Sequence, residues 1–405
     1  MSSIIKVDTI QDQAGNNIIS ESSNTITIGA SGDTITIPSG ATFTNSGTTS
    51  AITISGALTV DGGTIKLDGS YPTGTDNTAL GDTALDSVEA GGTSNTVIGH
   101  NAGTAITTGD GNTAVGDLAL DANTTASNNV AIGCGALGAN TTGEVNTAVG
   151  TASMVTNTTG YGNTALGKNS LYTNNGNNNT AVGHEALELN TSGANNVAVG
   201  RQALEANTTA SNNTAVGLCA LKTNTTGCQN TAIGSFSLFD VTTGCQNVGV
   251  GYGSGANITT GVCNTAIGHN SFNTATTGDN NVAVGREALY ANTTADNNTA
   301  LGFQSLKANT TGSTNTAVGL CALNANTTAS DNTAVGKNSL LVNTTGALNN
   351  AVGSGSLMAN TTGSNNAALG NDALRFNTTG AGNIAVGRQA LFCNTTADDN
   401  VALGY

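Results

Sequence analysis

Residues 196–217 read NVAVGRQALEANTTASNNTAVG, a segment in which one short pattern ends and begins again after 17 residues. The glycines that close its two pentads, Gly200 and Gly217, belong to a series that runs from Gly81 to Gly404. Of the nineteen intervals in this series, seventeen are 17 residues long, one is 18 and one is 16. Such a period is typical of a stacked rod, because each unit buries its apolar residues against near-identical neighbours.

Each unit can be written N-T-A-V-G-x-x-A-L-x-x-N-T-T-G-x-x. The residue before the glycine is aliphatic in all twenty copies, and Leu recurs four residues after the glycine. We expect both to point into a core and to form two short strands per coil, because the units lack helical periodicity and Gly, Asn and Thr form helices poorly. The expected core ladder consists of Val115, Leu120, Ile132, Leu137, Val149, Val199, Leu204, Val216 and Leu221.

The pattern therefore predicts an all-β chain, whose main part is a parallel β-solenoid (β-roll) of about twenty 17-residue coils. At a strand spacing of about 4.8 Å, the rod would be about 95 Å long, with either handedness. Residues 1–75 do not follow the period. They contain alternating segments such as NTITI, separated by Gly, Ser, Asn and Asp, which predict short strands. We expect a β-rich attachment or stem segment at residues 1–75 and the solenoid shaft at residues 76–405.

Ala stands two residues before the glycine in eighteen of the twenty copies, with Val97 and Gly249 as the exceptions. A position restricted to small side chains indicates close packing. One Val and one Leu per coil bury little apolar surface within a single chain, so we expect chains to associate along this Ala face as a homotrimer. The expected inter-chain contacts are Ala114, Ala131, Ala148, Ala198 and Ala215.

Composition excludes several classes of protein. Only 9% of the 405 residues are charged and 3% are aromatic, with no Trp and 55 Gly, which leaves too few large side chains for a conventional core. The net charge of −15 argues against nucleic acid or an anionic bilayer as a partner. The first residues, MSSIIKVDTIQDQ, lack a basic region followed by a long apolar one, so we expect neither an export signal nor membrane insertion.

Residues that could carry chemistry are sparse. The three His residues, His100, His184 and His269, each follow a repeat glycine, at a position whose variety indicates exposure to solvent. Acidic residues are scattered, although stacking could bring Glu188 and Glu205, one period apart, close together. We expect no enzyme activity, no catalytic residue, no metal site and no cofactor.

Two further features leave alternatives open. The seven Cys are expected to be unpaired thiols, but Cys228 and Cys245 are one period apart, within disulfide range if they lie in adjacent coils. The repeated Asn-Thr-Thr segment is expected to stack and satisfy its own turns. Its Thr residues could alternatively form a flat, water-ordering array as in ice-binding solenoids, and its glycosylation sequons would matter only in a secreted chain.

The pentads at residues 129–133 and 196–200 resemble the SVAIG-type repeats in the heads of trimeric autotransporter adhesins, which implies left-handed trimeric β-rolls. The opening SSIIKVDTIQDQAGNNIISESSNTITIGASGDTITIPSGATF resembles the start of tail-fibre and other appendage proteins of marine bacteriophages. Together these resemblances imply a virion structural protein, made in the host cytoplasm. It would join the tail or baseplate through its N-terminal segment and contact a glycan or protein of the host surface. The alternatives are a bacterial cell-surface adhesin or stalk and, behind it, a glycan depolymerase.

Overall fold

The structure, a computed structural model, describes residues 9–11, 17–22, 25–28 and 76–405. The chain divides into two units, Met1–Lys66 and Leu67–Tyr405, whereas the sequence analysis placed the boundary between residues 75 and 76. No helix among the described residues has the length and hydrophobicity that a membrane span needs.

The first unit contains an antiparallel sheet in the order β1 (Thr9–Gln11), β2 (Asn17–Ser22) and β3 (Thr25–Ile28). Strand β3 lies within the NTITI segment, which the sequence predicted as a short strand. The strands predicted further along, in residues 29–75, lie outside the described residues.

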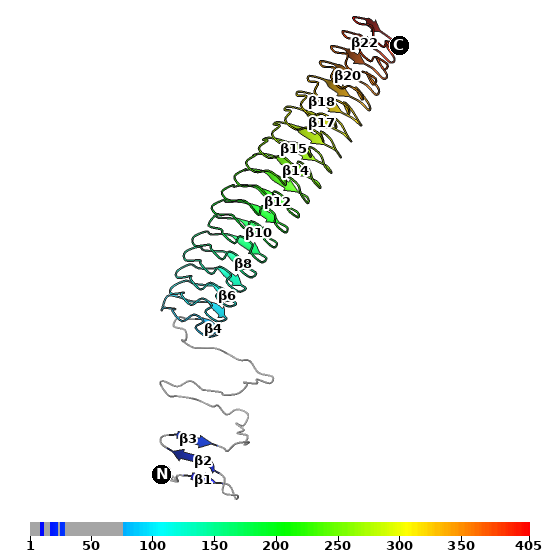
Figure 1. Cartoon of the computed structure of the whole chain (residues 1–405). Helices are drawn as coiled ribbons and strands as arrows, with labels where there is room; N and C mark the ends of the chain where they lie inside the picture. Colours follow the sequence, from blue (N-terminus) through cyan, green and yellow to red (C-terminus); the bar gives the residue numbers. More distant parts are fainter. Residues whose placement is uncertain (1–8, 12–16, 23–24, 29–75) are drawn as a thin grey trace. The chain divides into compact units, whose positions relative to one another are not determined.

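The second unit is a parallel β-solenoid of about nineteen turns, and each coil contributes one strand of three residues. Figure 1 shows these strands side by side in one row, with β4 and β23 at opposite ends. The strands are β4 (Thr78–Leu80), β5 (Thr96–Ile98), β6 (Thr113–Val115), β7 (Val130–Ile132), β8 (Thr147–Val149), β9 (Thr164–Leu166), β10 (Thr180–Val182), β11 (Val197–Val199), β12 (Thr214–Val216), β13 (Thr231–Ile233), β14 (Val248–Val250), β15 (Thr265–Ile267), β16 (Val282–Val284), β17 (Thr299–Leu301), β18 (Thr316–Val318), β19 (Thr333–Val335), β20 (Asn350–Val352), β21 (Ala367–Leu369), β22 (Ile384–Val386) and β23 (Val401–Leu403).

Equivalent residues of neighbouring coils pair in register, as Ala198 pairs with Ala215. The single 16-residue interval keeps this register, because β9 and β10 still pair at the same phase. Its missing residue falls in the Asn-Thr-Thr segment, where the Asn175 side chain accepts a hydrogen bond from the Thr158 backbone N–H at 2.8 Å. In other coils a Thr carbonyl accepts this bond, as when Thr141 N donates to Thr158 O. A turn side chain thus replaces the missing acceptor.

The second apolar half of the coil is a run of turns, and the prediction of a second strand there is wrong. Leu120 and Leu137 have φ angles of 55° and 49°, in the left-handed region that strands do not use. The residue two after the glycine is also left-handed, as at Gln202 with φ 57°. These bends turn the chain back within 17 residues. Hydrogen bonds between coils persist, for example from Leu137 N to Ser153 O at 3.0 Å.

The repeat glycine is required by both conformation and space. Gly150 has a φ of 135°, and a Cβ placed on it would lie 2.6 Å from the carbonyl carbon and oxygen of Gly167 in the next coil. Residues other than glycine rarely adopt that backbone conformation. The stacking of these glycines brings backbone onto backbone at the end of every strand.

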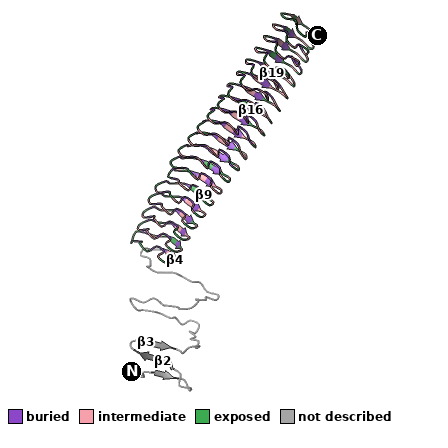
Figure 2. Ribbon diagram, viewed as in Figure 1, coloured by how far each residue is buried: buried purple, intermediate pink, exposed green. Residues whose placement is uncertain are grey.

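Two ladders of buried Asn side chains run along the stack. In the first, formed by the first residue of each pentad, Asn298 Nδ2 donates to Gly312 O at 2.9 Å and Oδ1 accepts from Asn315 N at 3.0 Å. In the second, formed by the Asn-Thr-Thr segment, Asn309 Nδ2 donates to the same Gly312 oxygen at 2.8 Å, and Oδ1 accepts from Asn326 Nδ2. Figure 2 shows buried residues continuing through the coils. The Asn side chains therefore form interior structure, and not an exposed edge.

The two ladders differ in how strictly they require Asn. The first ladder has Asn in all twenty coils. In the second ladder, a buried apolar residue stands in place of Asn in five coils: Val88, Ile106, Val241, Ile258 and Ala275. Two of these replacements accompany a glycine at the Leu position. A Cβ on Gly255 would meet Ile258 Cδ1 at 3.0 Å, and one on Gly103 would meet Ile106 Cδ1 at 2.9 Å. Ile therefore fills the space that Leu leaves in those coils.

Candidate functional site

The Leu residues of the expected core ladder lie in the interior. Leu120, Leu137, Leu204 and Leu221 are fully buried. Each projects inward from the left-handed turn segment and packs in one continuous hydrophobic core with the Ala residues of the strands.

The residues before the repeat glycine do not line the core, and their assignment to the core ladder is corrected. Ile132, Val199 and Val216 are 39%, 36% and 36% exposed, and Val115 and Val149 are partly exposed. Successive strand residues point to opposite faces. Because the central residue of each strand points inward, its two neighbours must point outward.

The Ala residues expected at an inter-chain contact lie inside their own chain, so that assignment is wrong. Ala114, Ala131, Ala148, Ala198 and Ala215 are all 0% exposed in a single chain. They are small because each faces the Leu of the turn segment across a narrow interior.

One coil shows how narrow that interior is. Val97 replaces Ala there, and the Leu position of the same coil is Gly103. A Cβ on Gly103 would lie 3.3 Å from Val97 Cγ2. In this coil, the larger side chain at the Ala position therefore accompanies the loss of the side chain at the Leu position. The periodicity alone did not reveal this pairing.

The first and third residues of β4–β23 form a continuous surface, which we call the outer strand face. Its third position is Val, Ile or Leu in every strand, and its first position is Thr, Val, Asn, Ala or Ile. None of these residues is charged. Stacked at about 4.8 Å, the twenty strands extend this face over about 90 Å. The third-position side chains form an aliphatic row along this face, and an exposed apolar row of this length is typical of a protein–protein contact.

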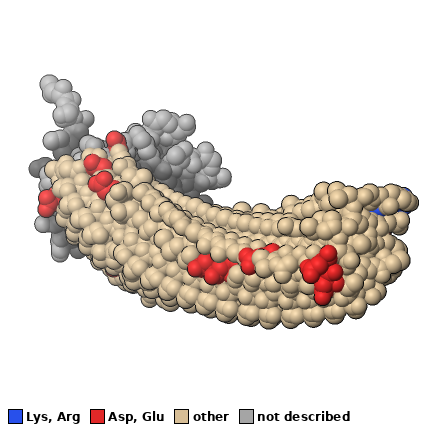
Figure 3. Space-filling view, turned by 90° about the horizontal axis from the view of Figure 1, so that it is seen from above, with Lys and Arg blue, Asp and Glu red and all other residues tan. Residues whose placement is uncertain are grey.

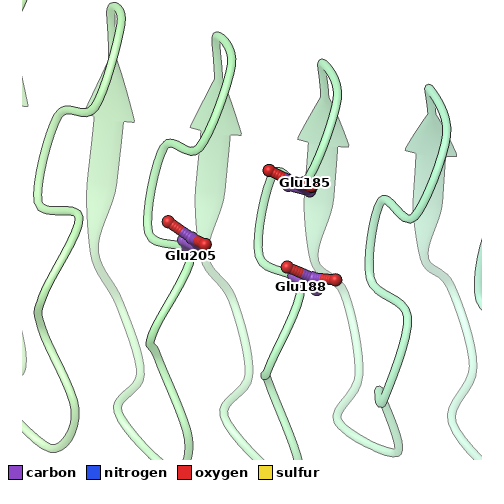
Figure 4. A group of neighbouring side chains, drawn as sticks. All are labelled: Glu185, Glu188 and Glu205. Carbon is purple, nitrogen blue, oxygen red and sulfur yellow. The ribbon is translucent and has the colours of Figure 1, made fainter.

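A second candidate site is an acidic cluster of Glu185, Glu188 and Glu205, shown in Figure 4. One carboxylate oxygen from each lies within 4.8 Å of the others. Stacking brings Glu188 and Glu205 together, as their spacing of one period predicted, but that spacing gave no indication of Glu185. Glu185 is two residues after a repeat glycine and has a φ of 59°. This left-handed bend places it in the same turn segment as Glu188.

Neighbouring groups set the electrostatics of this cluster. Burial, followed by the charges of Glu185 and Glu205, raises the pKa of Glu188. Lys222 Nζ lies 3.1 Å from Glu205 Oε2, and Gln202 Nε2 donates to Glu185 Oε2 at 2.9 Å. The cluster has oxygen donors suited to a hard divalent cation, but the ammonium group of Lys222 already compensates part of its charge.

Other charged and polar groups are dispersed. On the face shown in Figure 3, acidic side chains form a few separate groups on an otherwise mostly uncharged surface. His100 contacts Asp117 at 2.9 Å, His184 lies 3.4 Å from Glu185, and His269 stacks on Tyr252. The three His residues lie in separate coils with separate partners, and the described part of this chain does not bring them together.

The Thr residues of the Asn-Thr-Thr segment divide into two classes. The first Thr donates along the stack, as when Thr208 Oγ1 donates to Thr225 O at 3.0 Å. The second is exposed, as at Thr209. Only alternate hydroxyls of the segment are therefore available for the water-ordering array considered above.

Comparison of the chain with protein-family models, curated proteins and solved structures finds no match.

Proposed function

We propose that this chain is a virion structural protein, a trimeric tail fibre or similar appendage of a bacteriophage. Its N-terminal segment joins it to the tail or baseplate, and the solenoid acts as a shaft that carries host-surface contacts away from the particle. The resemblance of the first residues to phage appendage proteins supports the attachment role. The outer strand face is the observation that supports a multi-chain shaft.

The proposed association uses the outer strand face in place of the buried Ala ladder. Covering a half-exposed Val, Ile or Leu side chain contributes about 1 kcal/mol. Twenty coils could then supply on the order of 20 kcal/mol per chain, against an association cost of about 4–15 kcal/mol. The face carries no charge, so contact between copies does not bring like charges together despite a net charge of −15 per chain.

Identical coil spacing lets copies match along their whole length. Chains attached through the same N-terminal segment run in the same direction, and cyclic symmetry gives every copy the same environment. Three chains follow from the resemblance to trimeric adhesin heads. The resulting shaft has a mechanical role, with repeated weak contacts to a host surface strengthened by avidity.

The oligomer is tested by mass photometry of the full chain with Val199→Asp and Val216→Asp variants. The expected wild-type mass is three times that of one chain. Each variant should weaken the trimer, so that a larger share of the chains is monomeric at the same concentration than in the wild type. Each should retain the β-rich circular dichroism spectrum, because the substituted side chain lies outside the core. Thr209→Asp is the matched control, since Thr209 is exposed in the turn between these strands. A monomeric wild type, or equal dissociation of the control, would refute the proposed interface.

The virion role needs a separate test. Antibodies raised against residues 76–405 should label appendages of purified phage particles in electron micrographs. Labelling of a bacterial surface without any label on particles would favour the alternative of a cell-surface adhesin or stalk.

A further inference from the structure

Two thiols meet on the surface of the solenoid. Cys228 and Cys245 are one period apart, and their Sγ atoms lie 3.0 Å from each other. This separation is about 1 Å longer than a disulfide bond of about 2.05 Å. Both residues are partly exposed, so a small oxidant can reach them.

The fold orients the second thiol toward the first. Cys245 Sγ accepts a hydrogen bond from the Cys228 backbone N–H at 3.0 Å. Other coils place an acceptor at the same phase: Ser211 Oγ accepts from Ala194 N at 3.0 Å. The side chain at this phase therefore points along the stack at the preceding coil. Register is fixed beside it by Gln246 N, which donates to Cys228 O at 3.0 Å.

A third thiol nearby provides a contrast. Cys263 is close to Cys245 in number but lies one phase later in its coil. Its Sγ contacts Gln246 Oε1 at 3.2 Å. Gln246 and Cys263 share one phase of the repeat, so they belong to the row of side chains next to the row that contains Cys228 and Cys245. Sequence proximity alone therefore does not make a thiol pair here.

We propose that Cys228 and Cys245 form a disulfide between adjacent coils when the chain meets a small-molecule disulfide such as oxidised glutathione. The link would tie two surface turns together and oppose local separation of their coils. It depends on the solenoid fold and is independent of the proposed fibre role.

The chemistry proceeds by two thiol–disulfide exchanges. The Cys245 thiolate attacks one sulfur of oxidised glutathione, which forms a mixed disulfide and releases one glutathione thiolate. The Cys228 thiolate then attacks the Cys245 sulfur and releases the second glutathione. Two protein thiols are oxidised to one disulfide, one glutathione disulfide is reduced to two thiols, and the two protons pass to the released glutathiones.

Hydrogen bonding explains why Cys245 attacks first. The backbone N–H of Cys228 donates to Cys245 Sγ at 3.0 Å and holds that sulfur beside Cys228. The pKa of the Cys228 thiol is raised, first by its hydrogen bond to Cys245 and then by burial. Cys228 therefore holds its proton longer and acts in the second step.

The test is peptide mapping of the full chain after incubation with oxidised glutathione. Free thiols are alkylated, and the denatured chain is digested with trypsin and Asp-N, which cleave after Lys222 and before Asp240. The expected product is a linked pair of peptides, 223–239 and 240–278, with Cys263 alkylated. Its mass is two hydrogens lower than the sum of the two separate peptides with Cys228 and Cys245 as free thiols, and the pair separates on reduction.

Three variants identify the thiols. Cys228→Ser and Cys245→Ser should each abolish the linked pair, whereas Cys263→Ser should retain it. Ser already occupies the phase of Cys228 and Cys245 at Ser211, so Cys228→Ser and Cys245→Ser should keep the β-rich circular dichroism spectrum of the wild type. Wild-type peptides that carry only alkyl groups or glutathione would overturn the proposal. So would a link that survives Cys245→Ser and disappears in Cys263→Ser.

Discussion

The first Asn ladder should tolerate substitution less well than the second. In Asn298→Ala, three side-chain hydrogen bonds are lost: one to Gly312 O at 2.9 Å, and two from Asn315, through N at 3.0 Å and Nδ2 at 3.2 Å. The Gly312 oxygen keeps its bond from Asn309, and Asn315 Nδ2 keeps its bond to Ala329 O. The buried Asn315 backbone N–H loses its acceptor.

The expected cost follows from these contacts. A stranded buried N–H costs about 1–3 kcal/mol, and each of the other two lost bonds costs about 1 kcal/mol, which gives about 3–5 kcal/mol for Asn298→Ala. Asn309→Ala loses the bonds to Gly312 O and from Asn326 Nδ2. Asn326 Nδ2 still donates to Ala329 O, so no group is stranded and the cost is about 2 kcal/mol.

Hydrogen exchange measured by mass spectrometry on the full chain reports local opening of these coils, and urea denaturation reports overall stability. Exchange near Asn315 should accelerate about 5- to 150-fold more in Asn298→Ala than in Asn309→Ala, which corresponds to the 1–3 kcal/mol difference. In the double variant, Gly312 O receives no hydrogen bond from the side chain of residue 298 or residue 309. The loss in free energy of unfolding should therefore exceed the sum of the losses in the two single variants. Equal exchange in both single variants, or strict additivity, would refute the assigned roles of the two ladders.

Four further outcomes are expected. Gly150→Ala should destabilise by about 3 kcal/mol or more in thermal denaturation, because its Cβ meets the next coil. Gly135→Ala, with φ 65° and only an ordinary contact of its Cβ with Val155 Cγ2 at 3.8 Å, should cost about 1 kcal/mol. Deleting residues 264–280, one full period, should leave a folded rod by circular dichroism, whereas deleting eight residues from the same start should disrupt it; equal damage would contradict the coil assignment. Hydrogen bonds from Lys and Gln side chains lower the pKa of Glu287 to about 2, so its stabilisation is present above pH 4.5 and is lost as pH falls toward 2; Glu287→Gln should remove that part of the pH dependence of the unfolding midpoint. Because the pKa of Glu188 is raised, its ionisation lowers stability at neutral pH. Glu188→Gln should therefore raise the unfolding midpoint at neutral pH, and a lower midpoint would contradict this reasoning.

The acidic cluster shows why the candidate sites were harder to predict than the fold. The period placed Glu188 and Glu205 near each other, because residues of equal phase must stack. Glu185 joins them only because its turn segment bends through left-handed φ angles. Leu and Glu rarely adopt that conformation, so residue type gave no indication of the bend.

The sequence by itself determined the period, the parallel register, the inward Leu row and the surface turns that absorb length changes. These follow from repetition, since identical units must stack at equal phase to bury the same residues. Only the tertiary structure decided which strand face lies inside. Successive strand residues point to opposite faces, which places Ala and Val on opposite faces but does not say which face lies inside. That depends on the width of the interior beside the Leu side chain. That width admits Ala, so the aliphatic residue before each glycine lies on the surface, where the proposed contact between chains would be made.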